Sequence, residues 1–201
     1  MKKTSIIAII AIACVAVFSA CGNKAKTAEE APEAVAISVD EVLANADSLA
    51  GDTITIEGVC SHLCSHGAMK AFIAGSADSI MLRCEANPYM GQAFPLDMTR
   101  RPVQVKGILV EQRIDSAAVV QMEEQYKTAL AQAAAQGQDT TTTHASGCET
   151  ERTAQGQRDI TSFADRMEDY RQKIAARNEK DGKPYLSFYY LQAMYYEVLP
   201  E

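Results

Sequence analysis

Two stretches of alternating β-branched and polar residues, each interrupted by a glycine, most strongly constrain how this chain can fold. They are Thr53–Cys60, which contains Gly58, and Pro102–Ile114, which contains Gly107. Alternation with a period of two predicts strands, and a glycine inside a strand predicts a bulge or a sharp bend. Strands bent in this way favour a sheet that closes on itself.

Three further segments have strand character, namely Met69–Ala74, Ile80–Cys84 and the aromatic segment Tyr185–Leu199. Together with the two bent strands they make five, with the bent strands first and fourth. The sequence therefore predicts a mainly β protein with a five-stranded barrel of the OB (oligonucleotide/oligosaccharide-binding) type. Residues 38–201 are expected to form this single domain.

Helical segments are expected before the barrel and inside it. Ser38 and Glu41 stand at the N-cap and capping-box positions of a short helix that precedes the first strand. Asp115–Gln136 has a helix-favouring composition, and Asp159–Arg177 has apolar residues three to four positions apart. These two helices would be inserted before the last strand, joined by residues 137–157, which are poor in apolar side chains and predict a mobile loop.

The amino terminus has the features of a bacterial lipoprotein signal peptide over residues 1–20. Lys2 and Lys3 precede an apolar run that ends in small residues directly before Cys21. The run of about 14 residues is shorter than the ~20 residues that a membrane-spanning helix needs. We therefore predict that Cys21 is the acylated first residue of the mature protein. The alternative is a secretory signal peptide cut elsewhere, with Cys21 as a bystander.

A lipid at Cys21 would anchor the protein in the cell envelope, where we expect it in the outer membrane, facing the periplasm. Residues 21–37 lack a periodic apolar face until their end and predict a flexible tether. The net charge of the whole chain is −7, which disfavours a nucleic-acid partner because such binding depends on Lys and Arg. No phosphate-binding loop, serine elbow or paired-carboxylate motif occurs, so a binding module is favoured over an enzyme. The identity of a protein or small-molecule partner stays open.

One group of chemically reactive side chains stands out, at alternate positions from Cys60 through His62 and Cys64 to His66. Thiolate and imidazole together suit zinc or copper, so the leading hypothesis is a metal site on the first hairpin. In an extended strand these alternate residues point to one face and lie about 6.5–7 Å apart, so one ion would reach only two neighbours. Further ligands require the hairpin to fold back or other residues to approach. Candidates for an additional ligand or a disulfide are Cys84, His144 and Cys148.

Three alternatives remain open. The four cysteines of the domain allow three disulfide pairings in an oxidising compartment, which would be a purely structural role. A thiol-dependent redox protein would use Cys64 with Cys60 or Cys84. An OB module could instead bind an oligonucleotide, which the charge disfavours, or a glycan, by stacking it on aromatic rings. The closing strand is rich in such rings: Tyr185, Phe188, Tyr189, Tyr190, Tyr195 and Tyr196.

Parts of the chain resemble a family of uncharacterised Bacteroidetes lipoproteins with an OB-like fold. The resemblance rests on LANADSLAGDTITIEGVCSHLCSHGAMKAFIAG, the later GILVEQRI and the closing YLSFYYLQAMYYEVL. The family's first hairpin has an H-x-C-x-H-G-x-K-like stretch. Here His62, Cys64, His66 and Gly67 match it, and Met69 stands in the lysine position. The resemblance implies an OB-like fold and no particular activity.

Overall fold

The computed structural model describes residues 35–65, 67–77, 79–86, 88–137 and 148–200. By its contacts the chain divides into Met1–Glu33 and Ala34–Glu201, and all described residues belong to the second unit. None of the described helices is long and apolar enough to cross a membrane. Several predictions fall outside the described residues: the signal peptide, Cys21, most of the tether, His66, His144 and residues 138–147.

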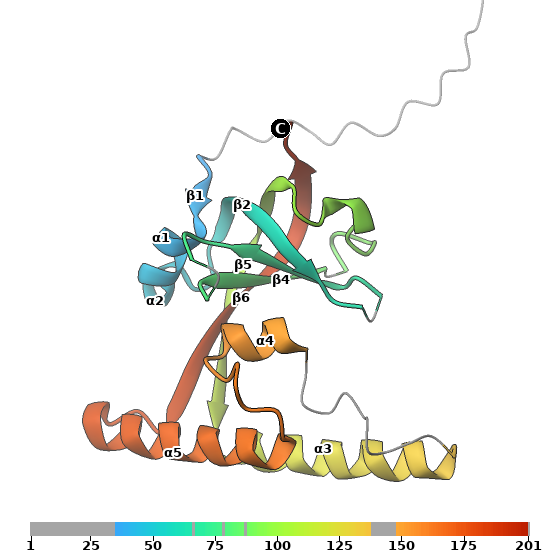
Figure 1. Cartoon of the computed structure of the whole chain (residues 1–201). Coiled ribbons are helices and arrows are strands. Elements are labelled where there is room, and N and C mark those ends of the chain that lie inside the picture. The colour runs from blue at the N-terminus through green and yellow to red at the C-terminus, as the bar shows by residue number, and fades with distance from the viewer. Residues whose placement is uncertain (1–34, 66, 78, 87, 138–147, 201) are drawn as a thin grey trace, which may run out of the picture. The chain divides into compact units, whose positions relative to one another are not determined.

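The described strands form one sheet (Figure 1): β1 (Ile37–Ser38), β2 (Thr53–Leu63), β3 (Lys70–Ala74), β4 (Met81–Ala86), β5 (Pro102–Asp115) and β6 (Tyr185–Val198). Their order is β1-β2-β3-β4-β6-β5, and β5 also pairs with β2, which closes a five-stranded barrel from β2 to β6. The β4–β6 pairing is parallel and the other barrel pairings are antiparallel. The prediction of a mainly β protein with a five-stranded OB-like barrel is confirmed.

The helices are α1 (Val39–Ala44), α2 (Ala46–Leu49), a 3₁₀ turn η1 (Leu96–Met98), α3 (Ser116–Ala135), α4 (Glu149–Ala154) and α5 (Phe163–Asp181). The predicted cap of the first helix is present, because Ser38 Oγ accepts a hydrogen bond from the Glu41 N–H at 3.2 Å. Between β5 and β6 the described residues form three helices, α3, α4 and α5, where the sequence predicted two. The additional helix α4 lies within the predicted loop 137–157, so the loop prediction is wrong for Glu149–Ala154.

The glycines of the two bent strands allow neighbouring strands to come close. A Cβ atom on Gly107 would lie 2.3 Å from the carbonyl oxygen of Gln192, and one on Gly58 would lie 2.7 Å from that of Ala74. The register of β5 and β6 is irregular at Gly107. In β2 the irregularity follows Cys60 and not Gly58. The predicted glycine bend therefore holds for β5, whereas Gly58 serves close packing against β3.

The described residues form two apolar clusters. The first fills the barrel and includes Ile56, Leu82, Leu109 and Leu191. The second forms where β5 and β6 continue beyond the barrel and α3 and α5 pack on them (Figure 1). Its buried members are Ile114, Val119, Met167, Tyr170 and Ile174. The last three come from the apolar face predicted for the second inserted helix.

Candidate functional site

Cys60 and His62 of the first hairpin do not lie on one face of the strand. Cys60 pairs with Ile73 and His62 with Phe72, so Ser61 is an extra residue that shifts the register. A bulge of this kind reverses the alternation of side chains. Cys60 is therefore completely buried in the barrel core. His62 lies on the opposite face of the strand, where its ring is 5.9 Å from the ring of Phe72, a residue that does not belong to the barrel-core cluster. The prediction that Cys60 and His62 share a strand face is wrong.

Cys60 instead lies near Cys84, inside the barrel. Both side chains are fully buried free thiols. Burial raises the pKa of Cys60 to about 11. Burial also raises the pKa of Cys84, and the neighbouring Cys60 raises it further. Because the thiolate is the reactive and metal-binding form, these two residues are poor ligands and poor nucleophiles at neutral pH.

A disulfide between these two core cysteines is also disfavoured by the sheet. Strand β3 lies between β2 and β4, and two strand spacings amount to roughly 9–10 Å. A disulfide requires Cα atoms no more than about 7 Å apart. Cys60 and Cys84 thus contribute packing to the barrel core as free thiols, and the disulfide of the structural alternative does not join them.

The other two domain cysteines, Cys64 and Cys148, lie near each other. Cys64 follows β2, and its N–H donates to the carbonyl oxygen of Lys70 at 2.9 Å. Cys148 is the N-cap of α4, where its Sγ accepts the N–H of Glu151 at 3.4 Å. Partial burial raises the pKa of Cys148, and nearby Cys64 contributes to this rise. Among the residues that the structure describes, no three His, Cys, Asp or Glu side chains are placed to hold a metal ion.

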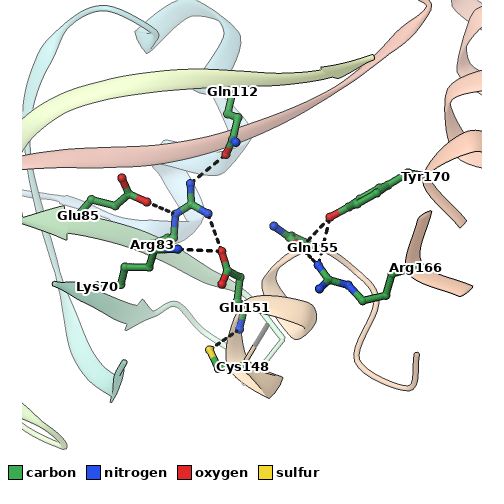
Figure 2. A network of polar contacts seen from close by, with 9 residues as sticks. All are labelled: Lys70, Arg83, Glu85, Gln112, Cys148, Glu151, Gln155, Arg166 and Tyr170. Carbon is green, nitrogen blue, oxygen red and sulfur yellow. Dashed lines mark hydrogen bonds and ion pairs between the residues drawn. The ribbon is translucent and has the colours of Figure 1, made fainter. Parts of the chain in front are cut away.

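Helix α4 is attached to the outer face of the barrel by an ionic network (Figure 2). Glu151 Oε1 lies 3.0 Å from Arg83 Nη1 and 3.2 Å from Lys70 Nζ. Arg83 Nε also lies 3.1 Å from Glu85 Oε1, and Arg83 Nη2 donates to Gln112 Oε1 at 3.0 Å. Arg83 thus connects α4 with β4 and β5.

The segment after α4 is bound to α5 by a second set of contacts, also drawn in part in Figure 2. Gln155 Oε1 accepts hydrogen bonds from the Tyr170 hydroxyl and from Arg166 Nη2, both at 2.8 Å. Arg166 Nε donates to Gln157 Oε1 at 2.8 Å, and Gln157 is almost completely buried. Residues 148–157 are therefore packed against both the barrel and α5, contrary to the loop prediction.

A cleft of about 370 Å³ lies between α4 and the barrel face. Aromatic walls come from Phe72 of β3 and from Phe188 and Tyr189 of β6. Polar groups come from Arg83 of β4 and from Glu151 and Gln155 at α4. A concave surface that combines apolar and aromatic side chains with a few fixed polar groups is the usual form of a small-ligand site.

The position of this cleft matches the ligand face of OB folds. That face is formed by the second and third barrel strands and by the loops after the first and fourth strands. Here the corresponding strands are β3 and β4, and α4 belongs to the long segment after the fourth barrel strand, β5. The inserted segment therefore supplies one wall of the cleft on the expected binding face.

Sequence reasoning identified some of these residues and missed others. Phe188 and Tyr189 were among the aromatic residues of the closing strand. Arg83 and Glu151 were missed, although an arginine inside an otherwise apolar strand was a usable signal. Nothing near Glu151 in the sequence indicates its partners, which lie 68 and 81 residues away.

No family model, no curated protein and no solved structure matches this chain.

Proposed function

We propose that the protein is a lipid-anchored, non-enzymatic module of the cell envelope that binds a neutral oligosaccharide in the cleft between α4 and the barrel. The observation that carries this proposal is the composition of the cleft. The partly exposed rings of Phe188 and Tyr189 line it together with the polar side chains of Arg83, Glu151 and Gln155. The ring of Phe72 also borders the cleft but is completely buried.

This composition suits a sugar because a sugar ring has an apolar face and a polar edge. The C–H groups of its face can pack on an aromatic ring, while its hydroxyls can donate to carboxylate and amide oxygens and accept from a guanidinium. Arg83 and Glu151 are held in place by each other and by their neighbours. Groups fixed before binding lose less conformational entropy when the ligand arrives.

An oligonucleotide is a poorer candidate for the same cleft. Arg83, which lines the cleft, is already paired with Glu151 and Glu85, and Lys70 is paired with the same Glu151. Binding a phosphate backbone needs unpaired cations, and the chain has a net charge of −7. A metal or redox role for the first hairpin receives no support from Cys60, which is buried among core side chains.

Titration calorimetry with maltotriose, cellotriose and chitotriose tests the oligosaccharide proposal. Replacing Tyr189 with leucine removes one ring from the cleft and should weaken binding between about two- and tenfold, the range expected for one aromatic contact. Tyr195→Leu is the matched control, since Tyr195 lies on the same strand, is half exposed and is not part of the cleft. Failure of all three sugars to bind would contradict the ligand class, and equal weakening by both variants would contradict the site.

The anchor is supported by the sequence alone, through the signal peptide and Cys21. Mass spectrometry of protein extracted from membranes should find a diacylglycerol and an acyl chain on the fragment that begins at Cys21. A Cys21→Ala protein should lose this mass and appear in the soluble periplasmic fraction. Wild-type protein that is soluble and carries no lipid would contradict the anchor without affecting the oligosaccharide proposal.

A further inference from the structure

A second, smaller cleft of about 220 Å³ lies where the extended parts of β5 and β6 meet the end of α5. Three cationic side chains line it, from Arg113, Arg177 and Lys183. Two acidic side chains, Asp47 and Glu111, also line it. The cleft thus has a local excess of positive charge in a chain whose net charge is −7.

Both acidic groups of this cleft already have partners. Glu111 Oε2 lies 2.9 Å from Arg113 Nη2, and Glu111 Oε1 accepts a hydrogen bond from Ser187 Oγ at 2.7 Å. These contacts lower the pKa of Glu111, which keeps it ionised. Asp47 accepts a hydrogen bond from the Tyr189 hydroxyl. Neither carboxylate forms an ion pair with Arg177 or Lys183.

Of the three cations that line the cleft, Arg177 and Lys183 form no ion pair with an acidic side chain among the described residues. Arg177 Nη1 donates to two neutral oxygens, the carbonyl of Tyr185 at 2.9 Å and Ser187 Oγ at 3.1 Å. Lys183 makes no hydrogen bond or ion pair within the described part of the chain. An anion in the cleft would therefore meet two cations whose charge is not neutralised.

The aromatic ring of Tyr185 helps to orient the guanidinium groups. The guanidinium carbon of Arg113 lies 4.6 Å from the centre of this ring and that of Arg177 lies 5.1 Å from it. Arg177 is also fixed by its two hydrogen bonds to β6. A guanidinium held in this way offers its N–H groups in a fixed, planar arrangement that matches carboxylate and phosphate oxygens.

We propose that this cleft is a binding site for a small anionic group, a phosphate or a carboxylate, contacted by Arg177, Lys183 and Arg113. The proposal does not depend on the oligosaccharide proposal, since the two clefts share only Ser187. A role for these cations in stabilising the carboxyl end of α5 does not account for Arg177, whose hydrogen bonds go to β6.

Calorimetric titration with inorganic phosphate and with acetate tests the site and separates the two sources of the anionic group. An ionic strength of about 10 mM keeps screening weak, because the Debye length is then about 30 Å. We expect saturable binding of at least one probe. Lys183→Gln should weaken it about tenfold, the value of one charge-assisted hydrogen bond, whereas Lys183→Arg should largely retain it.

Lys127→Gln is the matched control, because it removes the same charge from an exposed position on α3 that does not line the cleft. It should change the affinity less than twofold. The absence of saturable binding for both probes would overturn the proposal. An unchanged affinity in Lys183→Gln, or equal weakening by Lys183→Gln and Lys127→Gln, would also overturn it. Lys183 makes no side-chain hydrogen bond or ion pair within the described residues, so the variant is expected to fold, and circular dichroism checks this.

Discussion

Replacing Glu151 with alanine should release α4 from the barrel while the barrel stays folded. Glu151 joins α4 to two described barrel strands through ion pairs with Arg83 of β4 and Lys70 of β3. Alanine keeps the helix propensity of the position high and leaves the backbone cap from Cys148 unchanged. The variant therefore tests the ionic attachment itself.

The magnitude follows from the exposure of the partners. The side chains of Glu151 and Arg83 are 19% and 12% exposed, so their contact should contribute about 1.5–3 kcal/mol, as hydrogen bonds to charged groups do. The Lys70 side chain is 36% exposed and should add less than about 0.5 kcal/mol. In the variant Arg83 keeps its contacts with Glu85 and Gln112. Its charge is therefore not left buried without a partner, and the larger destabilisation that an unpaired buried charge causes does not apply. The expected total is about 2 kcal/mol.

Native-state hydrogen exchange measures this loss locally. Amides of residues 149–157 should exchange about thirtyfold faster in Glu151→Ala, because about 1.4 kcal/mol corresponds to a factor of ten, whereas the amides of β2 should be unchanged. Glu124→Ala is the control, since Glu124 forms a 2.7 Å ion pair with Lys127 in which both side chains are about two-thirds exposed. That variant should change exchange less than threefold. Unchanged exchange at 149–157, or equal acceleration throughout the barrel, would refute the role assigned to Glu151.

Two further predictions concern the core. Because burial raises the pKa of Cys60 from its ordinary 9.0 to about 11, the unfolded chain loses this proton first, so the free energy of unfolding should fall as pH rises from 9 towards 11. Urea titrations across this range should show a smaller fall for Cys60→Ala, and identical pH profiles would contradict the shift. Gly107→Ala should destabilise the barrel by about 2–3 kcal/mol because its Cβ would lie 2.3 Å from the Gln192 carbonyl oxygen. A midpoint of urea unfolding equal to that of the wild type would show that β6 can move away at little cost.

The sequence alone determined the strands, the main helices and the barrel. The period-two patterns around Gly58 and Gly107 and the capping pair Ser38 and Glu41 are local signals, because they depend on neighbours within a few positions. The apolar face of α5 is local in the same sense, and Met167, Tyr170 and Ile174 are buried as it predicted. Such signals can be recognised in the sequence without knowing which residues pack on the other side of the core.

Only the tertiary structure decided which side chains meet. Ser61 is recognised as an extra residue only when β2 is paired with β3. This extra residue directs Cys60 inwards and His62 outwards, and so separates the predicted ligands. Helix α4 has six residues and no buried side chain, so its sequence carries no apolar pattern. It is held by ion pairs with residues 68 and 81 positions away. Both features depend on long-range pairings, which local composition and spacing do not encode.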